Sequence, residues 1–369
     1  ERCITTSEMS NDARPPINLF AAQQQMLRER LNFLLRIVHP ALYADVVRAF
    51  QEEGKLLCKS LVDVNSPQTS HPAGMWSLLT LLVAQHVSPD IDPVYASSIG
   101  VSVECFCAAL DLLDDVEDED QTPIMQELGA ARVLNVTTAL LILAQQALLS
   151  LSELGADPAN ILRLLNTLQE SSLGITAGQH RDLLAEQRSA LDLTREECID
   201  IAAVKAGGLL CLACRLGAQC AGADTVLCEQ FAEFGLLLGI AAQLDNDCHD
   251  LYYLLQDVIP SILPGDAGGT SRSTKSDLLR GKKTLPIVLA AAEMAKTRRV
   301  TGESFDDALQ KISKLPDQER NEYLRALKEG ILTTWGICLL YRERARDRLH
   351  EFESLRPISP ALHILTGLE

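Results

Sequence analysis

The sequence has few aromatic residues and few positive charges. Only 4% of its 369 residues are Phe, Trp or Tyr, and 33 Lys and Arg residues face 50 Asp and Glu residues, so the formal net charge is −17. A chain this acidic repels the phosphate backbone, which argues against nucleic acid as a partner. A smaller phosphate-bearing ligand is compatible with this charge if divalent cations lie between it and the carboxylates.

The sequence also lacks a secretory signal and an uninterrupted apolar run. Residues 1–15 are polar, and we expect them to form a disordered leader on a cytoplasmic protein. The most apolar stretch, Val133–Leu151, contains Asn135 and Gln145. A buried core helix explains this stretch better than a membrane span does, so no stable membrane span is expected.

No disulfide framework or zinc motif is recognisable among the cysteines. The chain has 11 of them, an odd number, and several lie in apolar helical stretches. They are typical of small buried side chains in a reducing compartment. Cys211 and Cys214 form a CxxC pair, but no second cysteine pair or histidine pair accompanies them, so a zinc site is not expected.

Leu and Ala dominate what remains, and they favour helices over strands. Hydrophobic residues make up 47% of the chain, and helical periodicity runs from about residue 16 nearly to the end, so we predict one all-α domain over residues 16–369. Helices are expected near residues 17–37, 41–56, 73–88, 93–118, 128–153, 157–173, 175–189, 194–219, 223–256, 284–297, 302–313, 318–330, 334–352 and 359–367. The longest irregular segment, Ile259–Ser276, is expected to be functional.

A first carboxylate cluster ends the helix predicted over 93–118. Asp114 and Asp118 are four residues apart and share a helix face, and Asp115 lies beside them. Like charges at this spacing repel, and a helix C-terminus disfavours anions, so the cluster favours bound cations. A solvated acidic turn is the alternative, but the apolar approach through residues 108–113 argues against it.

A second cluster lies on the helix predicted over 223–256. Gln243, Asp247 and Asp250 form one stripe, and Asn246 is four residues before Asp250. The apolar residues that precede the stripe place it inside a bundle, where an unpaired carboxylate costs several kcal/mol and metal ligation resolves that cost. His249 points off the stripe and is interpreted as a bystander. Helix bundles build metal sites from facing helices, so the two clusters together predict one magnesium site.

These patterns resemble the trans-isoprenyl diphosphate synthase (polyprenyl synthetase) family over roughly residues 65–350. The matching segments are Asp114–Asp115 with Asp118, Gly178–Gln179 with Asp182–Leu183, Lys205–Ala206, Gln243 with Asn246, Asp247 and Asp250, and Asp277–Pro286. Asn246 stands where the family has Asp, and Ala206 stands where it has Thr.

The resemblance implies a single helical bundle of the class I isoprenoid (terpenoid) synthase type that ionises an allylic prenyl diphosphate. It implies about three Mg²⁺ ions and a homodimer. The implied metal ligands are Asp114, Asp115, Asp118, Asn246, Asp247 and Asp250. The implied diphosphate-binding residues are Lys205, Gln243, Arg272 and Lys282. The implied catalytic residues are Asp114, Asp118, Asp247 and Lys205.

The chain departs from the family where the second substrate, isopentenyl diphosphate, binds. A Lys and an Arg of the family are replaced by Ala73 and Gly74, a His is replaced by Cys107, and Asp120–Pro123 stands in place of an Arg pair. These changes remove most of the positive charge that a second diphosphate needs. The allylic half of the site is therefore expected to be intact and the isopentenyl half to be lost.

Several functions are compatible with this combination. A terpene synthase that cyclises or quenches one allylic cation is the leading interpretation, and Asn246 fits it because terpene synthases commonly begin the second motif with Asn-Asp. Prenyl transfer to another acceptor, chain elongation with replacement residues, and a non-catalytic regulatory subunit are the alternatives.

The family also implies a pocket. Leu110 and Ala109 lie at the positions that set pocket depth, and neither is aromatic, so a C15–C20 or longer prenyl chain is expected. Gln179 is expected in the same pocket. Trp76 lies in the former polar site, where it either shapes the product cavity or packs in the core.

Overall fold

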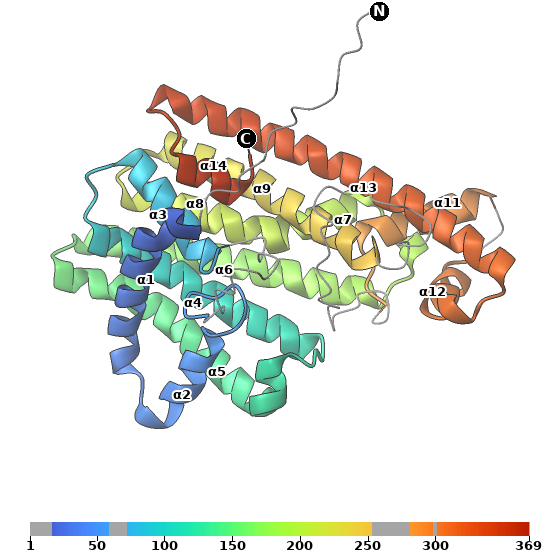
Figure 1. Ribbon diagram of the computed structural model, residues 1–369, viewed down its shortest axis with the longest axis horizontal. Helices are drawn as coiled ribbons and strands as arrows, with labels where there is room; N and C mark the ends of the chain where they lie inside the picture. The colour runs from blue at the N-terminus through green and yellow to red at the C-terminus, as the bar shows by residue number, and fades with distance from the viewer. Residues whose placement is uncertain (1–16, 59–71, 253–280, 298–300, 369) are drawn as a thin grey trace, which may run out of the picture.

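The computed structural model describes residues 17–58, 72–252, 281–297 and 301–368, and all regular structure in these ranges is helical (Figure 1). The predicted all-α fold is therefore confirmed. The leader over residues 1–15, most of the loop-containing segment before Gly281, and with it Arg272, lie outside the described residues.

The described ranges contain the following helices. In order they are η1 (Ile17–Phe20), α1 (Ala21–Leu34), η2 (Leu35–Ile37), α2 (Pro40–Ala49), α3 (Met75–Val87), α4 (Pro93–Glu117), α5 (Pro123–Leu149), η3 (Ser150–Leu154), α6 (Pro158–Glu186), η4 (Ala190–Asp192), α7 (Arg195–Ala202), η5 (Ala203–Gly207), α8 (Gly208–Cys220), α9 (Thr225–Tyr252), α11 (Leu285–Thr297), α12 (Gly302–Gln310), η7 (Ile312–Lys314), α13 (Asp317–Glu351), η8 (Phe352–Ser354) and α14 (Pro360–Thr366).

Helix α4 forms the centre of the bundle. It packs against α1, α3, α5 and α8, and 83% of its most apolar segment is buried inside the protein. Its first turn is fixed by Asp92, whose side chain accepts hydrogen bonds from Val94 N (2.8 Å) and Tyr95 N (2.9 Å). The helix that carries the first aspartate cluster is thus held by the core along its length and capped at its start.

Helices α9 and α13 form a second long layer. Figure 1 shows α13 running along the long axis of the molecule beside α9, and α13 also packs on α11. Cys248 and Cys338, one on each of these helices, donate their thiols to backbone carbonyls across the layer. The second aspartate cluster therefore projects from a helix that is packed on both sides.

Two predicted helix breaks were wrong. The sequence suggested a break at Gly174 and another after Gly330, but α6 and α13 are continuous through these positions. A Cβ added to Gly330 would lie 2.3 Å from Pro286 O, so this glycine allows α11 and α13 to approach closely. Tertiary packing outweighs the helix penalty of glycine, which is only about 1 kcal/mol.

Other helix boundaries differ from the predicted ones because of local features of the backbone. The helix predicted over 194–219 is interrupted at η5, a π-helical turn between α7 and α8. Helix α5 begins at Pro123 and kinks at Gly129, where φ is 74°. Helix α2 ends at Ala49, and turns follow up to Cys58. A π-turn has no distinct sequence pattern, so periodicity alone could not find it.

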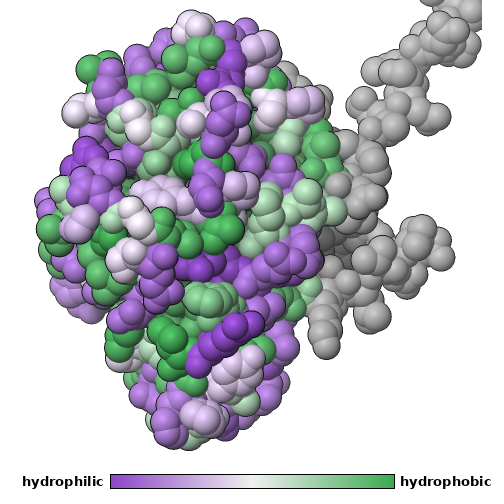
Figure 2. Space-filling model, turned by 90° about the vertical axis from the view of Figure 1, so that its left-hand side faces the viewer, coloured by the Kyte–Doolittle hydropathy of each residue, from purple (hydrophilic) through white to green (hydrophobic). Residues whose placement is uncertain are grey.

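Among the described residues, four helical segments are long and apolar enough to cross a membrane by length and composition alone: α4, α5 with η3, α7 to α8, and α9. The prediction of a buried core helix over Val133–Leu151 holds for one face, since 44% of this apolar window is buried and Leu134, Ile142 and Leu149 are exposed. Figure 2 shows one end of the molecule, where apolar and hydrophilic side chains are interspersed.

An aromatic cluster joins α3, α9 and the end of α13. The rings of Phe231 and Phe352 stack with their centroids 3.9 Å apart, Phe234 meets Phe352 edge-on, and His86 packs beside Phe231. These rings are almost fully buried, so the cluster anchors the end of the bundle far from the aspartates of α4.

Substitution of Phe231 by Ala is expected to lower the free energy of unfolding by about 3–5 kcal/mol, because it leaves a cavity in this cluster. Val226→Ala, on the same helix but at a 68% exposed position, is the matched control and should change stability by less than about 0.5 kcal/mol. Urea unfolding followed by circular dichroism measures both. Equal losses in the two variants would contradict this role of the cluster.

Candidate active site

The first aspartate cluster lies at the end of α4 and is held by side chains from other helices. Asp114 accepts hydrogen bonds from Lys205 Nζ at 3.0 Å and from Gln179 Nε2 at 2.9 Å. Gln179 Nε2 also donates to Glu117 at 2.8 Å. The predicted Gly-Gln motif on α6 and the predicted lysine on η5 therefore meet the first aspartate motif in space.

Lys205 bridges two helices. Its ammonium group contacts Asp114 on α4 and Asp182 on α6, each at 3.0 Å. Burial lowers the pKa of Lys205, but the carboxylates of Asp114 and Asp182 raise it, and the net shift is upward. The side chain is therefore a cation at neutral pH, although only 21% of it is exposed.

A second lysine reaches the cluster from the segment before α11. Lys282 Nζ lies 2.9 Å from Asp118 Oδ2, and both side chains are nearly buried, with 12% and 2% exposed. Gly281 adopts a φ of 78°, which a residue with a Cβ rarely adopts, and so turns the chain into this position. The predicted Lys282 and the predicted Asp118 thus form one ion pair.

The turn after α4 folds back on the motif. Thr122 Oγ1 donates to Asp115 Oδ2 at 2.9 Å, and Asp120 N donates to Asp115 O at 2.9 Å. Glu119 adopts a φ of 54°, the left-handed region that costs a non-glycine residue free energy. The segment Asp120–Pro123, where the sequence lacks a pair of arginines, therefore serves to orient Asp115.

The second cluster lies on α9 near the same helices. Asp247 is buried and accepts a hydrogen bond from Gln243 Nε2 at 2.8 Å. Burial raises the pKa of the Cys198 thiol to about 12, and the neighbouring carboxylates of Asp247 and Asp182 raise it as well. The Cys198 thiol also donates to Lys283 O, beside the predicted Lys282.

The other predicted residues of this helix are more open to solvent. Asp250 is half-buried and Asn246 is exposed. His249 is exposed too, and its Nδ1 lies 2.9 Å from Asp245 O on its own helix. The roles of Asp250 and Asn246 as metal ligands and of His249 as a bystander stay predictions.

Close backbone contacts fix the position of η5. A Cβ added to Gly178 would lie 2.9 Å from Lys205 N, and one added to Gly239 would lie 2.7 Å from Ala206 O. Only glycine allows α6 and α9 to approach the π-helical turn this closely. Lys205 is therefore placed by two helices, each of which also carries residues of the site.

The donor set suits a hard divalent cation. Within the described residues, no three Asp, Glu, His or Cys side chains converge as a metal-binding group. Two buried acceptors in this region, Gln179 Oε1 and Thr284 Oγ1, have no hydrogen-bond partner within the same ranges. Magnesium takes oxygen ligands, and the carboxylates of the two motifs together with these buried oxygens supply them, so the chemistry of the residues present fits the implied Mg²⁺.

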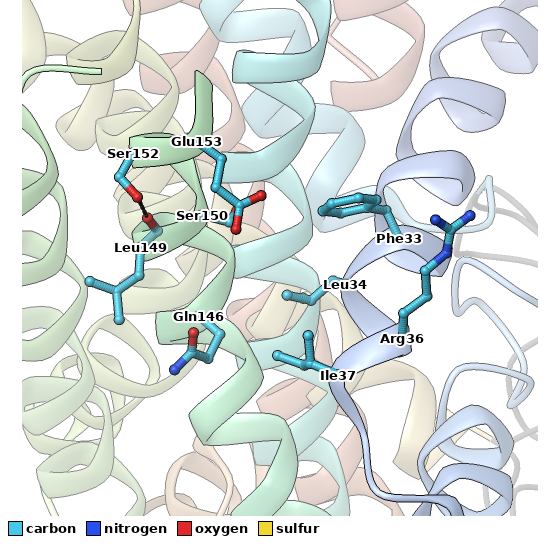
Figure 3. Close-up of a pocket in the computed structure, with 9 residues that line it drawn as sticks. All are labelled: Phe33, Leu34, Arg36, Ile37, Gln146, Leu149, Ser150, Ser152 and Glu153. Atoms are coloured by element: carbon cyan, nitrogen blue, oxygen red, sulfur yellow. Dashed lines mark hydrogen bonds between the residues drawn. The ribbon is translucent and has the colours of Figure 1, made fainter. Parts of the chain in front are cut away.

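The predicted pocket residues stay predictions. Ala109 is fully buried, while Leu110 and Trp76 are half-buried and pack against the core. A pocket of about 340 Å³ lies elsewhere, where Phe33 and the neighbouring residues of α1 and η2 face the end of α5 (Figure 3).

That pocket is remote from the aspartates. Ser102 Oγ donates to Ala144 O at 2.7 Å, which fixes the register of α4 against α5 and places the pocket toward the start of α4. From Ser102 to Asp114 the helix rises about 18 Å, so the pocket in Figure 3 is not part of this site.

A family model described as "Polyprenyl synthetase" matches residues 73–318, about two thirds of the chain, and this range includes both aspartate clusters. The chain belongs to the polyprenyl synthetase family. The family resemblance seen in the sequence is thereby confirmed.

Two relatives that carry out different reactions are similar to this member of the family. The geranylfarnesyl diphosphate synthase of Aeropyrum pernix is 29% identical over 202 residues, which cover 53% of this chain and 56% of the relative. The tryptophan prenyltransferase ComQ of Bacillus spizizenii is 28% identical over 214 residues, which cover 58% of this chain and 61% of the relative. The chain thus spans little more than half the length of either relative.

The fold is also similar to the folds of solved structures. The polyprenyl synthase of Caulobacter crescentus CB15, complexed with calcium and isoprenyl diphosphate, superposes with a TM-score of 0.69 at 20% identity, covering 95% of each chain. The architecture is therefore the isoprenoid synthase fold that the resemblance implied.

Sequence reasoning missed several residues of the site. Asp182 and Thr284 lie within matched motifs but were assigned no role, although Asp182 is the second partner of Lys205. Thr122, which donates to Asp115, was expected only to replace part of a lost arginine pair. Lys55 was overlooked as well, and it contacts Asp111 on α4. The signal for Lys55 in the sequence is the pair Gly54–Lys55, a glycine followed by a lysine, which the comparison with the family at Ala73 and Gly74 did not include.

Substitution of Gly178 by Ala is expected to destabilise the protein by about 1–3 kcal/mol, because the new Cβ would press on the backbone at Val204 and Lys205. Gly174→Ala is the matched control, since a Cβ there has no atom within 4 Å. Thermal unfolding should separate the two variants by several degrees. If Gly174→Ala were equally destabilising, the close approach at η5 would not be the cause.

Proposed function

We propose that the protein is a magnesium-dependent prenyltransferase that ionises an allylic prenyl diphosphate. The observation that carries this proposal is the pairing of Asp114 and Asp118 on α4 with two lysines from separate segments, Lys205 and Lys282. Carboxylates that could bind a cation and lysines that could bind a diphosphate thus meet at one face of α4.

The chemistry follows from the positions of the two lysines. Ionisation breaks the bond between the allylic carbon and the diphosphate oxygen, and the electron pair leaves with the diphosphate. Lys205 and Lys282 place two ammonium groups where that negative charge develops. Their charges act strongly because both side chains are largely withdrawn from water.

The implied metal would be held by the aspartates of the two motifs. Asp114, Asp115 and Asp118 on α4 and Asp247 with Asp250 on α9 are the candidate ligands, and exposed Asn246 is a further one. When bound, Mg²⁺ supplies Lewis-acid stabilisation of the leaving diphosphate. Gln243 orients Asp247 through the 2.8 Å hydrogen bond, and Gln179 does the same for Asp114.

Prenyl transfer is compatible with more than one acceptor. The two relatives are named for chain elongation and for prenylation of tryptophan, and both activities are prenyl transfer. A terpene cyclase is the second candidate, which Asn246 and the loss of cations at Ala73 and Gly74 favour. The side chains of Ala109 and Leu110, neither of which is aromatic, favour a C15–C20 or longer donor.

Incubation with Mg²⁺ and the C10, C15 and C20 allylic diphosphates, with and without isopentenyl diphosphate, tests the proposal. We expect diphosphate release to fall at least about 100-fold in Asp114→Ala and in Asp247→Ala. Asp317→Ala, an aspartate whose side chain is 87% exposed on α13, should leave release unchanged.

Mass spectrometry of the products separates the candidates. Longer prenyl diphosphates identify elongation, prenylated acceptor identifies transfer to another compound, and hydrocarbons or alcohols formed without acceptor identify a cyclase. Absence of diphosphate release from every donor would contradict the proposed function.

We also propose a homodimer and a cytoplasmic location. Leu134, Ile142 and Leu149 recur on α5 at spacings of seven or eight residues and leave an exposed apolar stripe on one face. Such a stripe is typical of a surface that another protein covers. The ten described cysteines are free thiols, as a reducing compartment would keep them.

Ile142→Glu is expected to convert a dimer of about twice 40.3 kDa to monomer, because the charge would be buried in the interface. Leu340→Glu, at a 65% exposed position on α13, is the control and should leave the mass unchanged. Sedimentation equilibrium measures both. A wild-type protein that sediments as a monomer would contradict the homodimer.

A further inference from the structure

A third lysine–carboxylate pair stands beside the two pairs of the active site. Asp111 contacts Lys55, Asp114 contacts Lys205 and Asp118 contacts Lys282. The three aspartates are at positions i, i+3 and i+7 of α4, so they share one face of the helix. Asp111 belongs to neither aspartate motif, and Lys55 belongs to none of the predicted lysine motifs.

The position of Lys55 is fixed by the segment Ala73–Gly74, which lacks the Lys and Arg of the family. Gly74 N donates to Gly54 O at 2.8 Å, which ties the turn that carries Lys55 to the start of α3. A Cβ added to Gly74 would lie 2.7 Å from Leu56 Cδ1, so the two segments are in close contact. Lys55 therefore provides a cation on the side of the site where Ala73 and Gly74 lack one.

Carboxylates surround that cation. Besides Asp111, the buried Glu104 lies near Lys55, and it accepts hydrogen bonds from Ser77 Oγ at 2.9 Å and Leu56 N at 3.2 Å. Burial lowers the pKa of Lys55, but Asp111 and Glu104 raise it, and the net shift is upward. Lys55 is thus a buried ammonium group whose charge is balanced within the protein.

This balance differs from that at the other two lysines. The partners of Lys205 and Lys282 include the motif aspartates that are proposed to bind metal, whereas Asp111 lies outside the motifs. A diphosphate that approached Lys55 would meet the negative charge of Asp111, half of whose side chain is exposed. It would have to displace an ion pair that is already formed, which is costly for a buried partner.

We propose that Asp111 is a specificity-determining residue: by holding Lys55 it keeps the acceptor side of the site free of net positive charge, so the acceptor is an uncharged, electron-rich π system and not a diphosphate. This inference rests on the proposed prenyl transfer. The allylic C–O bond breaks, the acceptor's π electrons form a new C–C bond to the allylic carbon, and the acceptor loses a proton to the departing diphosphate. No oxidant or further reactant is needed.

Binding of isopentenyl diphosphate without a donor tests the role of Asp111 independently of turnover. Isothermal titration is expected to give weak binding to the wild type and at least about tenfold tighter binding to Asp111→Asn, because one charge pair is removed. The double variant Asp111→Asn with Lys55→Met should return to weak binding. Asp317→Asn is the control for the loss of an exposed carboxylate and should behave as wild type.

Acceptor use provides the second measurement. With a C15 donor and Mg²⁺, N-acetyl-tryptophanamide should be prenylated by the wild type, and isopentenyl diphosphate should serve as an acceptor only in Asp111→Asn. The inference is overturned if wild type binds isopentenyl diphosphate as tightly as Asp111→Asn, or if Lys55→Met does not reverse the gain. Absence of diphosphate release from any donor would instead refute the prenyl transfer, while the titration still decides the role of Asp111.

Asp111→Leu repeats the titration in a second variant that also removes the charge. It guards against an effect of the Asn side chain itself, and thermal unfolding verifies that each variant is folded. Equal, weak binding in Asp111→Asn and Asp111→Leu, both folded, would overturn the inference.

Discussion

The structure depends on the neutralisation of like charges along one face of α4. Carboxylates one turn apart repel one another, and their place near the helix C-terminus adds an unfavourable interaction with the helix dipole. Asp118 has only 2% of its side chain exposed, so without a counter-ion it would cost several kcal/mol. Lysines from three segments that are far apart in the chain provide this charge, and their convergence joins the N-terminal turns, η5 and the start of α11 to one helix.

Backbone packing makes that convergence possible. Lys205 lies in a π-helical turn that α6 and α9 both approach at glycines, so its ammonium group is fixed by main-chain contacts as well as by its ion pairs. π-Helical turns are frequent at functional sites because they shift a side chain out of the regular register. The same contacts bring the lysine to Asp182 of α6 and to Asp114, which Gln179 of α6 also holds.

The two sides of the site solve the same charge problem differently. On the proposed donor side, lysines are paired with aspartates that are candidate metal ligands, so a diphosphate and its divalent cation would enter as a neutralised unit. On the other side, Lys55 is enclosed by Asp111 and the buried Glu104, and a hydrogen-bonded network holds the carboxylates in place. The net charge of the chain therefore does not predict what binds at each place. The partner of each carboxylate decides whether a cation or a diphosphate can bind there.

The sequence by itself determined the helical class, most helix positions, the family and the two aspartate motifs. These features depend on periodicity and on residues close together in the chain, such as Asp114 with Asp118, which share a helix face wherever the helix lies. It did not determine that α6 and α13 run unbroken through Gly174 and Gly330, because packing against other helices outweighs a weak local preference.

Only the tertiary structure decided which charges meet. The pairing of Lys55 with Asp111 joins residues 56 positions apart, and that of Lys282 with Asp118 joins residues 164 positions apart. Such contacts arise from how whole helices pack, and the spacing of residues along the chain carries no record of them. The turn at Gly54–Lys55 meets the start of α3 beside Ala73 and Gly74, so only the three-dimensional structure shows that Lys55 lies there and that Asp111 neutralises it.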